Sequence, residues 1–123
     1  MKNLIKYISL FIISITMSSA TARADYQKGL DAYNAEDYAT ALREWRPLAN
    51  QGLASAQYNL GVMYDNGRGV PQDDVEAYKW WNLAAAQGNA FAKSHKEIVE
   101  KKMTRQQIAE GQRLSREWFN EHQ

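Results

Sequence analysis

The feature that most restricts the fold of this 123-residue chain is an internal repeat with an offset of 36 residues. The segment Leu48–Ala56 (LANQGLASA) recurs as Ala84–Ala92 (AAAQGNAFA), with five identical positions. The same offset relates two earlier pairs, Trp45 with Trp81 and Ala41 with Ala77. Repeats of this length are typical of arrays in which small units stack on one another and share a continuous core.

The composition and periodicity of the chain favour helices. Strong helix formers dominate after residue 24, and apolar residues recur at steps of three and four. Pro47 should kink or interrupt the helix that contains it, because proline lacks a backbone donor. We expect antiparallel helix pairs at residues 26–35 with 37–51, 54–66 with 73–87, and 90–102 with 104–120.

Two local patterns carry further expectations. Gly52 and Gly88 follow predicted helices at the position where a left-handed residue is preferred. Trp80 and Trp81 are neighbours, about 100° apart around a helix. We therefore expect Trp81 to be buried and Trp80 to be partly exposed.

The N-terminal residues 1–24 fit a signal peptide. Two lysines flank the start of an apolar run, Leu4–Met17, and Ala22–Ala24 has a small-x-small cleavage pattern. The run is shorter than the roughly 20 residues that a spanning helix needs. We expect cleavage after Ala24, or alternatively after Ala20, and export to the periplasm or the extracellular space without stable membrane insertion.

Charge and cysteine content exclude several classes of protein. Cleavage after residue 24 removes three of the 15 Lys and Arg residues and none of the 14 acidic residues, so the net charge becomes 12 − 14 = −2. Nucleic-acid-binding domains are usually basic, so we expect no nucleic-acid partner. The chain has no cysteine, which excludes disulfides and thiol catalysis.

The stretch Gly61–Val70 (GVMYDNGRGV) is the main candidate for a phosphate or metal site, and we interpret it as a turn. No strand pattern precedes it and no Lys-Ser/Thr pair follows it, as phosphate-binding loops require. Asp65, Asp73 and Asp74 do not follow the spacing of a calcium loop, and the two histidines do not form a zinc motif. We therefore expect no cofactor, no metal and no catalysis.

The spacing of the first unit resembles the tetratricopeptide pattern at Gly29, Tyr38, Ala41, Trp45 and Leu48. The next unit, ASAQYNLGVMYDNGRGVPQDDVEAYKWWNLAAAQG, resembles a Sel1-like repeat (SLR), a relative of the tetratricopeptide with a longer turn between its helices. Gly29 and Ala41 are 12 residues apart, whereas Gly61 and Ala77 are 16 apart. The signature positions are Gly29, Ala41, Trp45, Leu60, Gly61, Tyr64, Gly67, Gly69, Ala77, Trp81 and Gly88.

The resemblance implies an all-α fold, a short right-handed α-solenoid of antiparallel helix pairs. It would contain about two and a half repeats plus a C-terminal capping helix. The expected divisions are a signal peptide (1–24), a tetratricopeptide-like helix pair (25–51), a complete SLR (52–88) and a degenerate capping repeat (89–123). The chain looks like an exported bacterial member of the family.

The same resemblance implies a function. Proteins of these families bind proteins or peptides, so we expect a non-catalytic adaptor whose concave face is formed by the first helix of each pair. Transfer of the tetratricopeptide spacing predicts the partner-binding positions Leu30, Tyr33, Asn34, Ser55, Tyr58, Val62, Asp65 and Asn66. Two alternatives stay open, a cell-wall or β-lactam-related hydrolase and a structural subunit that self-associates weakly through its open ends.

Overall fold

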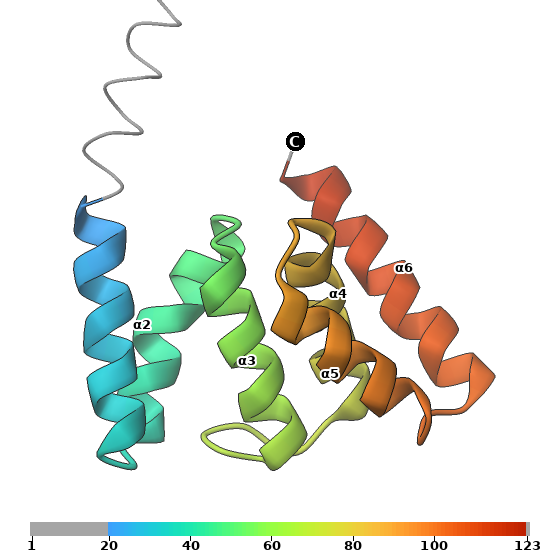
Figure 1. Ribbon diagram of the computed structural model, residues 1–123, viewed down its shortest axis with the longest axis horizontal. Helices are drawn as coiled ribbons and strands as arrows, with labels where there is room; N and C mark the ends of the chain where they lie inside the picture. Colours follow the sequence, from blue (N-terminus) through green and yellow to red (C-terminus); the bar gives the residue numbers. More distant parts are fainter. Residues whose placement is uncertain (1–19, 123) are drawn as a thin grey trace, which may run out of the picture.

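The computed structural model describes residues 20–122, and this part of the chain is an all-α helical repeat solenoid without strands (Figure 1). Its first helix, called the N-terminal helix, occupies residues 20–34. Five further helices follow it: α2 (Tyr38–Asn50), α3 (Ala54–Asn66), α4 (Asp74–Ala86), α5 (Ala90–Glu100) and α6 (Arg105–Glu121). The predicted fold class is confirmed, and five of the six helices lie within two residues of their predicted ends.

The helices form two layers and a cap. In Figure 1 the N-terminal helix, α3 and α5 lie on the near side, and α2 and α4 lie behind them. We call the near side the front face. Helix α3 packs against α2 and α4, while α4 also contacts α5 and α6. The first helix of each pair therefore contributes to one face, and α6 covers α4 at the C-terminal end.

The sequence repeat is also a repeat of contacts. The Trp45 indole nitrogen donates to the Tyr26 carbonyl, and the Trp81 indole nitrogen donates to the Tyr58 carbonyl, both at 3.1 Å. Each ring lies directly against a glycine of the first helix of its unit. A Cβ at Gly29 would come within 2.6 Å of Trp45 Cδ1, and the equivalent atom of the second unit would meet Trp81 in the same way. The repeated spacing of glycine and tryptophan thus places each tryptophan ring where a side chain larger than that of glycine would clash with it.

The prediction that Trp80 is partly exposed is wrong. Trp80 is only 5% exposed, and Trp81 is 2% exposed. Trp81 belongs to the cluster between α4 and α5, whereas Trp80 belongs to the cluster that extends to α2 and α3. Because α6 returns across α4 and Trp118 packs against the same cluster as Trp80, both sides of α4 are covered.

The predicted left-handed conformation of Gly52 and Gly88 is confirmed, and a further glycine and an aspartate side chain close other helix ends. Gly52 and Gly88 have φ of +96° and +93°, and Gly67 ends α3 at φ +65°. The Asp73 carboxylate accepts hydrogen bonds from the Val75 and Glu76 amides at the start of α4. Left-handed glycines end these helices at no steric cost, and the aspartate satisfies amides that have no partner within the helix.

Pro47 does not interrupt its helix, so that part of the prediction is wrong. Helix α2 continues from Tyr38 to Asn50 with Pro47 inside it. Pro47 lies on the exposed side of α2, where water can reach the Arg43 carbonyl that lacks its usual amide partner. The burial of Leu48 and Ala49 on the opposite side holds the helix in place.

The predicted signal peptide falls mostly outside the described residues, which begin at residue 20. Residues 20–24 belong to the N-terminal helix, so the prediction that this helix starts at residue 26 is wrong. The contacts of Tyr26 and Gly29 with Trp45 lie beyond the predicted cleavage site at Ala24. Among residues 20–122, no helix combines the length and the hydropathy needed to cross a membrane.

Candidate functional site

The candidate site is a hollow of about 230 Å³ on the front face, between the N-terminal helix and α3. Five of the eight predicted partner-binding residues line it. They are Leu30, Tyr33, Asn34, Tyr58 and Val62, and Trp45 and Asn59 complete the lining. The structure therefore brings together predicted residues from two helices, and the most distant of them, Leu30 and Val62, are 32 positions apart in the sequence.

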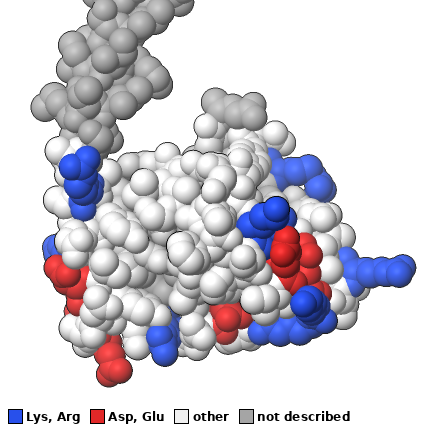
Figure 2. Space-filling model, in the orientation of Figure 1, with Lys and Arg blue, Asp and Glu red and all other residues white. Residues whose placement is uncertain are grey.

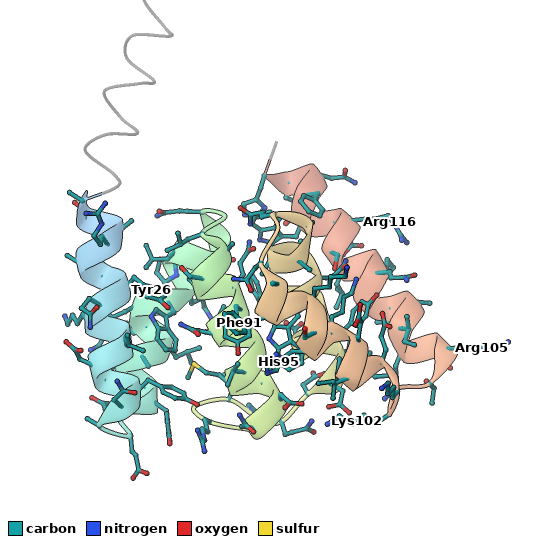
Figure 3. The ribbon with its side chains drawn as sticks, in the orientation of Figure 1. Tyr26, Phe91, His95, Lys102, Arg105 and Arg116 are labelled. Carbon is teal, nitrogen blue, oxygen red and sulfur yellow. The ribbon has the colours of Figure 1, made fainter. Side chains whose placement is uncertain are left out.

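Asn59 and Tyr26 fix one wall of the hollow. The Asn59 side-chain amide donates to the Tyr26 hydroxyl at 3.1 Å, which links α3 to the N-terminal helix. Tyr26 lies on the inner side of the N-terminal helix in Figure 3 and stacks on Trp45 with ring centroids 6.0 Å apart. These contacts hold the two helices at a fixed separation, so the hollow is part of the packed structure.

The other three predicted positions lie outside the hollow. Ser55 is half-buried in the first turn of α3, and Asn66 is exposed at the last residue of that helix. The Asp65 carboxylate lies 3.3 Å from the Lys102 ammonium, and Asp74 lies 3.4 Å from the same ammonium. Asp65 is therefore engaged with the C-terminal unit.

An aromatic cluster extends the site onto α5. The Tyr58 ring lies 6.1 Å from Phe91 and 5.3 Å from His95, and His95 lies 5.1 Å from Trp81. Phe91 is 70% exposed, which is unusual for so large an apolar side chain, and Ile98 on the same helix is 62% exposed. Figure 3 shows Phe91 and His95 on α5 beside α3.

Sequence reasoning missed Phe91 and His95. Their spacing of four residues within a helix was a usable signal, because it places both side chains on one face. Phe91 looks like a core residue in an apolar segment, and only the absence of a further helix in front of α5 in the described structure leaves it exposed.

The loop after α3 contributes a charged group to the edge of the site. The Arg68 Nη1 donates to the Tyr33 hydroxyl at 2.6 Å. Its guanidinium lies 5.7 Å from the Tyr33 ring centroid and 5.5 Å from that of Tyr38. The hydrogen bond to Tyr33 raises the pKa of Arg68, so the group stays cationic. The predicted turn is therefore docked on the preceding unit.

The front face has few charges near its centre. Figure 2 shows a largely uncharged central surface, with the acidic and basic side chains gathered toward the edges. Burial raises the pKa of the Tyr58 hydroxyl, and nearby Tyr33 and Tyr26 add to this effect, so Tyr58 is neutral at physiological pH. In the described part of the chain, no three His, Asp or Glu side chains converge as metal ligands would. The site offers aromatic, aliphatic and amide contacts.

Comparisons with known proteins agree with this architecture. Residues 54–89 match the family model described as Sel1 repeat. The chain is similar to chitin synthase regulatory factor 3 of Schizosaccharomyces pombe, with 41% identity over 48% of this chain and 6% of that protein. It is also similar to an exopolysaccharide production negative regulator of Rhizobium leguminosarum bv. viciae, with 35% identity over 51% of this chain and 24% of that protein. The chain thus spans less than a quarter of the length of these curated relatives.

A solved structure covers more of the chain. It is a protective antigen present in uropathogenic Escherichia coli strains that displays an SLR fold, and it superposes with a TM-score of 0.78. The sequences are 30% identical, and the match covers 82% of this chain and 23% of that protein. The family-model match identifies residues 54–89 as a Sel1 repeat, and the structural match shows that the described part of the chain has an SLR fold.

Proposed function

We propose that the chain is an exported, non-catalytic adaptor that binds a segment of another protein on its front face. The observation that carries this proposal is the hollow between the N-terminal helix and α3, together with the exposed Phe91 beside it. An exposed aromatic side chain next to a small apolar hollow is typical of surfaces that bind proteins. The partner is a protein or peptide, and the net charge of −2 expected after cleavage at Ala24 gives no reason to expect nucleic acid.

The chemistry of the face supports an uncharged peptide segment. Tyr58, Val62 and Leu30 offer apolar contact area, and Asn34 and Asn59 offer amide groups for hydrogen bonds to a peptide backbone. Tyrosine gives contact area at low entropic cost because its side chain has few rotatable bonds. A short solenoid presents a small interface, so we expect moderate affinity.

The relatives support regulation by binding. Both curated relatives are named as regulators, one of chitin synthase and one of exopolysaccharide production. A regulator without its own catalytic centre acts through the proteins that it contacts. We infer that this chain acts by binding and that its partner belongs to the cell envelope, where the predicted signal peptide would deliver it.

Affinity capture from envelope extracts tests the proposed face. Tyr58→Ala, Val62→Glu and Asn66→Ala probe the predicted positions, and Phe91→Glu probes the exposed aromatic residue. Ala39→Glu is a matched control, because Ala39 is exposed on α2 in the other layer. We expect Tyr58→Ala and Phe91→Glu to reduce the recovery of partners that Ala39→Glu retains. Equal recovery by all variants, with unchanged circular dichroism, would exclude the front face.

Export is tested separately. Expression with the native N-terminus in a Gram-negative host, followed by cell fractionation and N-terminal sequencing, should give a chain that starts at Asp25 or at Thr21. A full-length chain in the cytoplasm would contradict the proposed location. Sedimentation of the purified chain should give a monomer, and a stable homo-oligomer would favour the structural subunit instead.

A further inference from the structure

Arg68 is fixed in place although it lies on the surface. It belongs to the loop between α3 and α4, and its side chain reaches the N-terminal helix and the start of α2. A Cβ at the adjacent Gly69 would lie 3.1 Å from the Tyr38 carbonyl oxygen, so the loop backbone is seated against the first unit. Figure 1 shows this loop extending from α3 back toward the first helix pair. The guanidinium therefore loses little freedom when it binds a partner group.

Arg68 forms no ion pair in the part of the chain that the structure describes, although the Glu36 carboxylate is near enough to act on its charge. Lys28, Lys79, Lys102 and Arg113 each pair with at least one carboxylate. None of the ion pairs among residues 20–122 includes Arg68, whose hydrogen-bond partner is the hydroxyl of Tyr33. An ordered and exposed guanidinium with N–H groups to spare is suited to a carboxylate, which it can bind through two hydrogen bonds.

The hollow and the guanidinium are joined by one residue. The Tyr33 side chain lines the hollow, and its hydroxyl contacts Arg68. The hollow, at about 230 Å³, is smaller than the roughly 300–1,000 Å³ of typical small-molecule pockets, so it suits one or two apolar side chains. A ligand that uses both features must carry an apolar group and a carboxylate about one side chain apart.

We propose that Arg68 binds the C-terminal carboxylate of a partner protein whose last apolar side chain enters the hollow. At a C-terminus the carboxylate and the side chain leave the same Cα, which gives the short separation that the shared Tyr33 requires. Asn34 and Asn59 are placed along the hollow to contact the preceding peptide groups. The inference rests on the proposed function and specifies which part of a protein the front face recognises.

The test is a random heptapeptide array synthesised in two forms, with a free C-terminal carboxylate and with a C-terminal carboxamide. We expect the purified chain to select carboxylate peptides that end in an apolar residue. The amidated forms of these peptides should bind about 10- to 100-fold more weakly, as expected for the loss of a charge-assisted hydrogen bond. The preference should decrease at high salt, because screening weakens exposed charge pairs.

Three variants separate recognition from support of the loop. Arg68→Gln should abolish the ratio between carboxylate and carboxamide affinity, and Arg68→Lys should restore part of it. Arg46→Gln makes the same charge change at an exposed position of α2 and should leave the ratio unchanged. A residue that only supports the loop would change both affinities together and leave their ratio intact. Circular dichroism at each step verifies that the variants are folded.

The remaining outcomes distinguish the two proposals. If the carboxylate and carboxamide peptides bind with equal affinity, and Tyr58→Ala weakens the binding of both, the role of Arg68 is overturned and the adaptor function stays in place. The chain could instead select amidated peptides that contain an internal Asp or Glu, and Arg68→Gln could abolish this selection. That result would show that Arg68 binds an acidic side chain and would overturn the proposed recognition of a C-terminal carboxylate. The absence of any binding that depends on Tyr58 would overturn both.

Discussion

Replacement of Gly61 by alanine tests the packing of the repeat, because two physical effects oppose each other there. Gly61 lies inside α3, where alanine is favoured over glycine by about 1 kcal/mol on helix propensity alone. The new Cβ would lie 2.7 Å from Trp81 Cε2 and closer still to other atoms of the same ring. Trp81 is buried, so it has no open space into which it can move.

The magnitude follows from three contributions. Overpacking of a buried site costs about 1–3 kcal/mol. Displacement of the Trp81 ring also weakens its hydrogen bond to the Tyr58 carbonyl, which contributes about 1 kcal/mol. After subtraction of the gain in propensity, Gly61→Ala should destabilise the protein by about 1–3 kcal/mol. At about 4–8 °C per kcal/mol for a domain of this size, the Tm should fall by roughly 5–20 °C.

Urea and thermal unfolding followed by circular dichroism measure this change. Gly29→Ala should behave in the same way, because its Cβ would meet Trp45. Ala109→Gly, at an exposed position of α6, serves as the control for propensity and should cost about 1 kcal/mol. In the double variant Gly61→Ala/Trp81→Leu the two effects should be less than additive, since the smaller side chain removes the clash. A Gly61→Ala protein as stable as the parent, or more stable, would refute the packing argument.

Three further predictions concern the C-terminal unit. The Thr104 hydroxyl accepts a hydrogen bond from the Gln107 backbone amide in a capping box. Thr104→Ala should therefore lower the free energy of unfolding, measured in urea, by about 1 kcal/mol, while Thr104→Ser retains most of the stability. Truncation after Lys102 removes α6 and uncovers Tyr78 and the cluster around Trp80, so the Tm and the helical signal per residue should fall; an unchanged Tm would show that α6 is not a cap. Burial raises the pKa of Tyr78 above its usual value, so its contribution to stability is complete below about pH 10 and is lost as the pH rises through the folded-state pKa. Between pH 9 and 11 the parent should therefore lose more stability than Tyr78→Phe, and equal losses in chemical denaturation would contradict this.

The sequence predicted the helices well because their signals are local. Glycines at fixed offsets marked the helix ends, and the tryptophan spacing marked the second helix of each unit. The sequence also predicted that Leu30, Tyr33 and Tyr58 share a face, since the tetratricopeptide spacing carries over from one unit to the next. Their role in binding stays a prediction.

The missed features depend on contacts between distant parts of the chain. Arg68 and Tyr33 are 35 positions apart, and no periodicity relates a loop residue to a helix of the preceding unit. Trp80 was predicted to be partly exposed because helix periodicity describes one buried face, whereas α4 is covered on both sides once α6 returns to it. Phe91 was missed for the opposite reason, since an apolar residue with no neighbour in front of it cannot be told from a core residue by sequence alone.

The docked loop also has a mechanical consequence. In a stack of helix pairs, the angle between neighbouring units is normally held by side-chain packing alone, which tolerates small rotations. Here Arg68 and Gly69 add a second attachment away from the helix interface, where the loop rests on Tyr33 and Tyr38. Because the two units are attached at separate points, rotation of one unit against the other is resisted. The first and second units should therefore move as one stiff body.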